Sequence, residues 1–98
     1  MANLDNQTAL DVYRKLIEIR CVENTIANRY AEQEMRCPTH LSGGQEGVPA
    51  VLSVLLNQND FAVSTHRGHA HYLAKGGRLD QMIAEIYGKA TGCAKGLG

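Results

Sequence analysis

Large aromatic side chains are scarce in this sequence. Its 98 residues include no Trp, one Phe and four Tyr. Aromatic residues bury the most apolar surface per side chain, so a chain that lacks them must build its core from aliphatic residues. The composition, at 44% hydrophobic residues, is that of a globular protein. A chain of this length supports one small domain with a marginal core.

The sequence also has no excess of charge and no long apolar run. Ten basic and ten acidic residues cancel, whereas nucleic acids and anionic membranes select proteins with a positive excess. No stretch approaches the length that a bilayer span needs. The N-terminus has neither the regions of a signal peptide nor the Arg- and Ser-rich pattern of a transit peptide. We therefore expect no nucleic-acid or membrane partner and a cytoplasmic location.

Paired cysteines are absent as well. Cys21, Cys37 and Cys93 are widely spaced and include no C-x-x-C pair. This spacing argues against a disulfide framework and against a thiolate zinc site, so reduced thiols are expected.

The clearest expected element is a helix over residues 8–34, with Thr8 as its cap. Apolar residues recur along it every three or four positions, which is the spacing of one helical face. Charged residues such as Glu23 are expected largely outside this face. The apolar stripe comprises Val12, Leu16, Ile19, Val22, Ile26 and Tyr30.

Three further helices and one strand are expected after the first loop. The helices cover residues 45–56, 69–75 and about 79–87, the last ended by Gly88. Residues 61–65 are expected to form a short buried strand. One strand cannot form a sheet, because its backbone groups need neighbouring strands. We therefore expect residues 1–98 to be the N-terminal part of a single domain, truncated at its C-terminal end.

The segment from Ser64 to His71 is the strongest candidate for a site. A strand, a tight turn and the start of a helix direct backbone N–H groups toward an anion. Arg67 adds a charge suited to phosphate, and the neighbouring histidines can move protons near neutral pH. The alternatives are a solvated Arg67 among ordinary loop histidines, or a metal site. The metal site would use His66, His69 and His71, but their spacing is not an established zinc pattern.

Two other segments carry weaker signals. Residues 36–46 contain His40 beside adjacent glycines, so they could hold a substrate carboxylate or position a proton-transfer group. They could equally be a plain interhelical connection, with Ser42 or Gly44 capping the next helix. Residues 91–98 are rich in glycine, which allows close approach to a ligand but also marks a flexible tail.

Taken in order, the motifs resemble one family. They are T-H-L-S-G-G-Q-E-G, S-T-H-R-G-H, L-A-K-G-G and E-I-Y-G-K-A-T-G-C-A-K-G, at residues 39–47, 64–69, 73–77 and 85–96. This series resembles the alpha subunit of thiamine-diphosphate-dependent dehydrogenases, a family that includes the pyruvate, branched-chain 2-oxo acid and acetoin dehydrogenases. The resemblance covers nearly the whole chain.

The resemblance implies an α/β thiamine-diphosphate-binding fold, of which these residues would be a mostly helical part with one strand. It implies that His66 and Arg67 bind the cofactor's diphosphate, although many relatives carry Tyr-Arg there. His40 and His69 would be catalytic, orienting substrate or shuttling protons. Gln45 and Glu46 belong to the same motif, and for them a structural role is at least as well supported. No metal ligand is expected here, since the family's magnesium ligands would follow Gly98.

The implied activity is that of an oxidoreductase acting on oxo groups: oxidative decarboxylation of a 2-oxo acid, or cleavage of acetoin, with acyl transfer to a lipoyl group. The implied partners are a beta subunit, in a tetramer of two alpha and two beta chains, and a lipoyl-bearing acyltransferase. Residues 1–98 alone are expected to be inactive. The rival hypotheses are a small non-enzymatic helical module that binds metal through the clustered histidines, and a transketolase-like enzyme. The segment at Gly43 and at Gly47-Val48-Pro49 departs from the family pattern.

Overall fold

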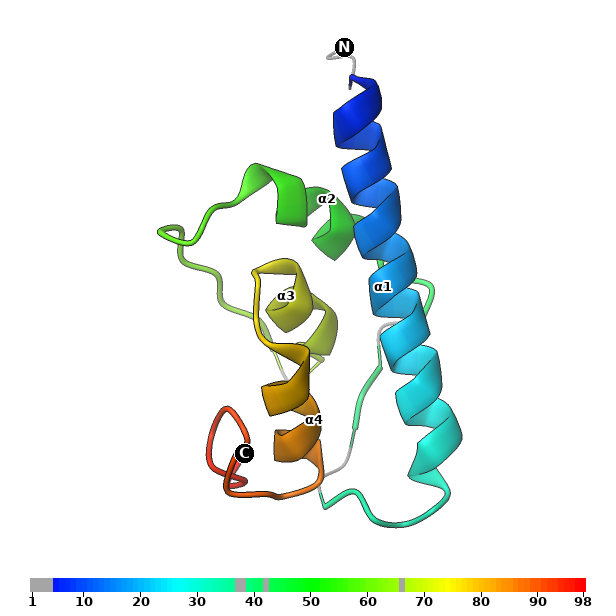
Figure 1. The fold of residues 1–98 in the computed structure, drawn as a ribbon, viewed down its shortest axis with the longest axis vertical. Coiled ribbons are helices and arrows are strands. Elements are labelled where there is room, and N and C mark those ends of the chain that lie inside the picture. Colours follow the sequence, from blue (N-terminus) through cyan, green and yellow to red (C-terminus); the bar gives the residue numbers. More distant parts are fainter. Residues whose placement is uncertain (1–4, 37–38, 42, 66) are drawn as a thin grey trace.

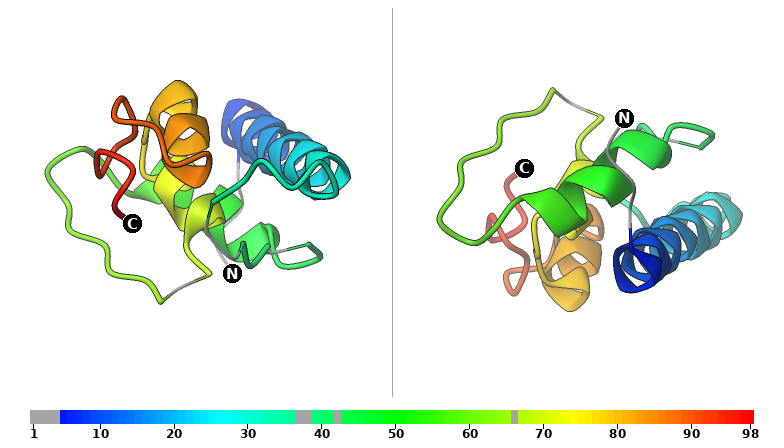
Figure 2. Two further views of the ribbon diagram at one scale, coloured as in Figure 1. Left: turned by 90° about the horizontal axis from the view of Figure 1, so that it is seen from below. Right: turned by 90° about the horizontal axis from the view of Figure 1, so that it is seen from above.

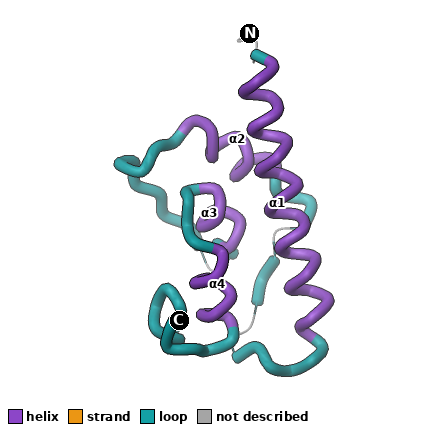
Figure 3. Tube along the Cα trace, in the orientation of Figure 1, coloured by secondary structure: helices purple, strands orange, loops and turns teal. Residues whose placement is uncertain are grey.

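The computed structural model describes residues 5–36, 39–41, 43–65 and 67–98. These ranges contain α1 (Asn6–Tyr30), α2 (Gly47–Leu55), α3 (His69–Ala74) and α4 (Leu79–Ile86), and no strand (Figures 1 and 3). The long α1 runs beside the three shorter helices, which lie together on one side of it (Figures 1 and 2). The expectation of a mostly helical chain is confirmed. Among the described helices, none combines the length and apolar composition needed to cross a membrane.

The first helix begins two residues before the predicted start. Its N-cap is Asp5, whose carboxylate accepts a hydrogen bond of 2.6 Å from the backbone N–H of Thr8. Thr8 is therefore inside the helix and not its cap, because a carboxylate three residues upstream already satisfies its N–H. The same hydrogen bond lowers the pKa of Asp5. The helix ends at Tyr30, four residues before the predicted end.

The buried face of α1 carries one residue that the sequence analysis placed wrongly. Ile19, Glu23 and Ile26 are its buried residues, and Glu23 is only 2% exposed. Glu23 follows Ile19 by four positions and precedes Ile26 by three, so all three share one helical face. The prediction that Glu23 lies outside the apolar stripe was wrong because it weighed the charge above the spacing.

The core joins α1, α3 and α4. Two residues from each helix form one buried cluster, and partly buried apolar side chains pack around it. Truncation of such residues removes buried apolar area and leaves a cavity, which makes them the most sensitive positions for stability. The cluster consists of Ile19, Ile26, Ala70, Leu73, Met82 and Ile86.

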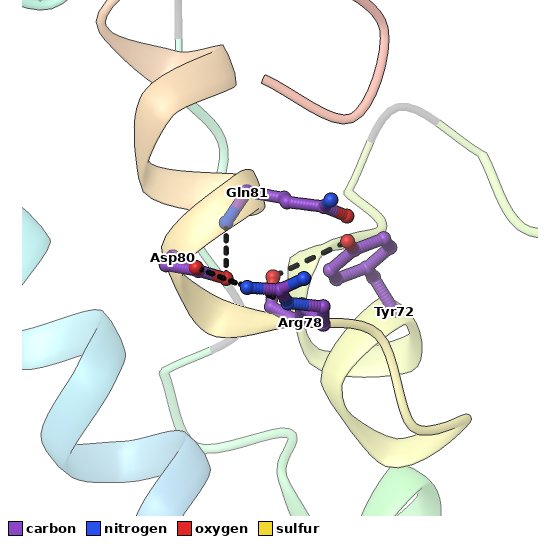
Figure 4. Close-up of polar contacts among 4 residues, drawn as sticks. All are labelled: Tyr72, Arg78, Asp80 and Gln81. Atoms are coloured by element: carbon purple, nitrogen blue, oxygen red, sulfur yellow. Dashed lines mark hydrogen bonds and ion pairs between the residues drawn. The ribbon is translucent and has the colours of Figure 1, made fainter. Parts of the chain in front are cut away.

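The ends of α4 are fixed by local chemistry. At its start, Asp80 pairs with Arg78 at 2.6 Å and accepts the backbone N–H of Gln81 at 2.9 Å (Figure 4). The hydroxyl of Tyr72 donates to the carbonyl of Arg78 at 3.2 Å, which ties α3 to this turn (Figure 4). At its end, Gly88 takes a φ of 71°, confirming the predicted stop.

Residues 61–65 do not form the predicted buried strand. They have no regular structure, and Phe61 and Val63 are each 99% exposed. The chain that follows α2, up to residue 65, forms a loop that extends away from the helices (Figure 2). Its backbone groups meet no neighbouring strand within the described chain, and a strand without a partner gains no ladder hydrogen bonds. The prediction of a strand at this place was therefore wrong.

The glycine-rich segment 91–98 is wrapped around one carboxylate. Glu85 accepts backbone hydrogen bonds from Ala94 at 2.7 Å, Gly96 at 2.9 Å and Gly98 at 2.7 Å. These bonds lower the pKa of Glu85, with the one from Gly96 contributing most. A Cβ at Gly96 would lie 2.8 Å from backbone atoms of Gly88, so the close winding requires glycine there. The segment is an ordered loop rather than a flexible tail.

We expect Glu85→Gln to loosen this loop. A glutamine has one acceptor oxygen and one NH₂ group, so either orientation sets a donor against a backbone donor. Hydrogen exchange at the amides of Ala94, Gly96 and Gly98 should accelerate by about tenfold or more. Asp80→Asn changes a carboxylate at the other end of the same helix and should leave these amides unaffected. Equal protection in Glu85→Gln and the unsubstituted protein would contradict the role given to the carboxylate.

Candidate functional site

A cavity of about 800 Å³ lies where the start of α2 faces the turn that precedes α3. Its walls come from two segments that are distant in sequence, the glycine-rich stretch before α2 and the residues around Arg67. The lining residues are Gly44, Gln45, Gly47, Val48, Pro49, Thr65, Arg67 and His71. The structure thus brings together the two segments that the sequence analysis singled out separately.

Arg67 supplies the charge of this cavity. It is the one charged side chain among the described lining residues. Its guanidinium is exposed, and none of the ion pairs between described residues includes it. An unpaired guanidinium with five N–H donors favours a doubly bonding anion such as a phosphate or carboxylate. The cavity is therefore suited electrostatically to an anionic ligand.

The turn that carries Arg67 is tight at position 68, where a side chain would force Ser64 and the carbonyl of Thr65 to shift. A Cβ on Gly68 would lie 2.6 Å from the Oγ of Ser64 and 3.1 Å from the carbonyl of Thr65. The glycine lets the chain fold back directly into α3. This places Arg67 and His71 on the same cavity wall.

The opposite wall is held by Glu46, whose carboxylate faces away from the cavity. Both of its oxygens accept hydrogen bonds from the guanidinium of Arg20 on α1, and Oε1 also accepts the backbone N–H of Gly44 at 3.2 Å. Glu46 is 2% exposed. The hydrogen bonds from Arg20 are the main reason that its pKa falls to about 2. Glu46 therefore anchors the loop structurally, one of the two roles that the sequence left open for this residue.

The capping proposed for α2 differs from what the structure shows. Glu46 is its N-cap, and no side chain makes a capping hydrogen bond there. Gly44 instead takes a φ of 83° two residues earlier, so the prediction of Gly44 as the cap was wrong. Ser42, the other candidate, lies outside the described residues.

The two histidines predicted to be catalytic lie next to each other. The imidazole of His69 hydrogen-bonds to the backbone of His40. Burial lowers the pKa of His69, the backbone hydrogen bond opposes that shift, and the nearby charge of His40 adds to it. His69 is half-buried and His40 is exposed. Neither belongs to the described lining of the cavity, so they form a neighbouring pair beside it.

The metal-site alternative finds no support in the described part of the chain. Within it, no group of three or more His, Cys, Asp or Glu side chains could hold a metal ion. His66, which was predicted to bind the cofactor and was a member of the alternative three-histidine set, lies outside the described residues. The glycine-rich segment 91–98 contributes no described residue to the cavity.

Two residues of this region were missed by sequence reasoning. Arg20 precedes Glu46 by 26 positions, and no local pattern connects them. His71 lay in the candidate segment but was assigned no cofactor-binding or catalytic role of its own, yet it lines the cavity. Its distance of four positions from Arg67, about one helical turn, is a signal that could have indicated a shared wall.

Comparison with known proteins places these features in a family. Residues 14–98 match the family described as dehydrogenase E1 component. The chain is 43% identical over 98% of its length to the alpha subunit of an acetoin:2,6-dichlorophenolindophenol oxidoreductase from Bacillus subtilis. It is 41% identical over 94% of its length to a chloroplastic pyruvate dehydrogenase E1 component alpha subunit from Oryza sativa subsp. japonica. A third relative, the corresponding acetoin protein of Cupriavidus necator, is 39% identical over 97% of this chain. The chain spans 29%, 22% and 28% of these three proteins.

Proposed function

Because the chain belongs to the dehydrogenase E1 component family, we propose that it forms the diphosphate-binding part of an α subunit in a thiamine-diphosphate-dependent dehydrogenase. The reaction would be oxidative decarboxylation of a 2-oxo acid, or the related cleavage of acetoin. Pyruvate and acetoin appear in the names of the similar proteins. The observation that carries the proposal is the cavity between α2 and α3, whose described lining has Arg67 as its one charge.

The described lining residues suit a diphosphate. Arg67 offers charge and paired donors, and Thr65 adds a hydroxyl. Gly44 and Gly47 line the facing wall, and a Cβ built on either would enter open space. Side chains at these two positions would project into free volume, whereas glycine leaves that volume open to a ligand. Arg67, with His66, would hold the diphosphate.

When bound, the cofactor supplies the electron sink for carbon–carbon cleavage. The protein's own contribution beside it is proton control. Burial lowers the pKa of His69, which favours the neutral form of its imidazole. The backbone of His40 orients the ring of His69, and His40 itself is exposed. We assign both histidines to substrate orientation or proton transfer.

The proposed partners follow from the same assignment. A β subunit would complete the active site in a tetramer of two α and two β subunits, and a lipoyl-bearing acyltransferase would receive the acyl group. Magnesium would accompany the diphosphate, with ligands outside residues 1–98. The relatives include chloroplastic and mitochondrial proteins, so the cytoplasmic location stays a prediction.

The proposal is tested with the α subunit assembled with its β subunit. We expect reduction of 2,6-dichlorophenolindophenol that requires both thiamine diphosphate with magnesium and either acetoin or a 2-oxo acid such as pyruvate. Omission of thiamine diphosphate should return the rate to background, because the cofactor carries the bond cleavage. Thiamine, which lacks the diphosphate, is the matched control and should not restore the rate. Turnover that is independent of thiamine diphosphate, or no turnover with any of these substrates, would contradict the proposal.

A further inference from the structure

His71 has no role in the proposed proton transfer or in the proposed contacts to the diphosphate. It lines the cavity of Arg67, and it also lines a second cavity of about 410 Å³, together with Ser64 and Tyr72. His71 thus borders two cavities. Its Nδ1 is buried and has no hydrogen-bond partner among the described residues.

The environment of Nδ1 determines the tautomer of the neutral ring. A buried N–H without an acceptor loses the hydrogen bond it makes to water, whereas an unprotonated ring nitrogen without a donor loses only a weaker interaction. The proton of neutral His71 therefore resides on Nε2. Unlike Nδ1, Nε2 is not among the buried unpartnered atoms of the described chain. The ring consequently presents an N–H donor at its accessible edge.

His69, a neighbour on the same helix, has a similar environment. The Nδ1 of His69 is also buried without a partner among the described residues. The hydrogen bond of its imidazole to the His40 backbone is consequently made through Nε2. When neutral, both histidines of the first turn of α3 thus carry their ring proton on Nε2. His69 directs it to a backbone acceptor, and His71 has no such acceptor in the described chain.

We propose that His71 is a further cofactor-binding residue, which donates its Nε2–H to a phosphate oxygen of the diphosphate that Arg67 holds. The inference rests on the proposed function, because it needs a diphosphate in the cavity between α2 and α3. Arg67 and His71 line the same cavity, so one group with several anionic oxygens can contact both. Arg67 supplies the charge, and His71 supplies a directional donor of fixed tautomer.

The test compares three variants in the α subunit assembled with its β subunit. His71→Gln keeps an N–H near the position of Nε2, whereas His71→Asn places its amide near Nδ1 and His71→Ala has no donor. Titration calorimetry with thiamine diphosphate should show a dissociation constant raised about tenfold by Ala and Asn. His71→Gln should stay within about threefold of the unsubstituted protein. Inorganic pyrophosphate, measured in competition, should follow the same order.

The outcomes separate this inference from the proposed function. If the unsubstituted protein does not bind thiamine diphosphate, the proposed function fails and the inference fails with it. If Arg67→Ala weakens binding while all three His71 variants bind normally, the inference alone is overturned. Equal weakening by Gln, Asn and Ala would also overturn it, because a packing role is insensitive to where the donor lies. Recovery in Gln alone supports it.

Discussion

In the α subunit assembled with its β subunit, Arg67→Ala should raise the dissociation constant of thiamine diphosphate by tenfold or more. Arg67 is the one charged side chain among the described residues that line the cavity, so its removal leaves no charge in that lining. Hydrogen bonds to charged groups contribute about 1.5–3 kcal/mol. A tenfold change in affinity corresponds to about 1.4 kcal/mol, so one such contact is sufficient for the effect. Titration calorimetry at fixed ionic strength measures it directly.

Two controls make the Arg67 experiment specific. Arg67→Lys keeps the charge but loses the paired donors, so we expect an affinity between those of Arg and Ala. Arg78→Ala removes an arginine that is 68% exposed and paired with Asp80, away from the described lining, and should leave the affinity unchanged. Affinity that stays unchanged in folded Arg67→Ala would remove the main support for a diphosphate in this cavity.

The parts of the fold that the sequence predicted well are those set by local signals. The helix over 69–74 and the helix over 79–86 were expected within a residue of their observed bounds. Apolar spacing sets the buried face of such a helix, and a glycine such as Gly88 ends it with a positive φ. These signals need no information from the rest of the chain.

The errors arose where distant residues decide the structure. A strand at residues 61–65 needs partner strands, and the described chain provides none, so the apolar run stays exposed. The burial of Glu23 was hidden by its charge, although its spacing placed it between Ile19 and Ile26. The charge of a carboxylate is a good guide to exposure only where no buried cation or hydrogen-bond donor compensates it.

The candidate site also combines features that local sequence predicts with features that depend on distant residues. Residue type and order proposed Arg67 and the histidines as site candidates, and the structure adds that the segment before α2 faces Arg67 across the cavity. No rule of local sequence predicts which two loops will face each other. The contact of Arg20 with Glu46 is of this kind, since it joins α1 to the start of α2 across 26 positions.

That contact leads to the second large effect: Arg20→Ala should lower the free energy of unfolding at neutral pH clearly more than the loss of an exposed, unpaired arginine does. The substitution removes both guanidinium hydrogen bonds from the Glu46 carboxylate and leaves it backbone hydrogen bonds such as that from Gly44 at 3.2 Å. The loss should be smaller than for a fully buried pair, because the Arg20 side chain is 47% exposed. Urea unfolding of the α subunit at pH 7 measures the change. Arg14→Ala, an exposed arginine on the same helix, is the matched control and should change stability by less than about 0.5 kcal/mol.

The pH dependence of the same variants identifies the cause. In the unsubstituted protein Arg20 holds the pKa of Glu46 at about 2, below its ordinary value of 4.5. A lowered carboxylate pKa stabilises the folded state fully above the ordinary value, and this contribution is lost as the pH falls from about 4.5 to about 2. Arg20→Ala removes the hydrogen bonds that lower the pKa of Glu46 most, while burial still raises that pKa. Protonation of Glu46 should therefore no longer reduce the free energy of unfolding between about pH 4.5 and pH 2. The double variant Arg20→Met, Glu46→Leu should recover much of the stability at neutral pH, since an apolar pair leaves no buried charge to compensate. If Arg20→Ala loses stability on acidification as steeply as the unsubstituted protein, the pair is not what anchors the wall of the cavity.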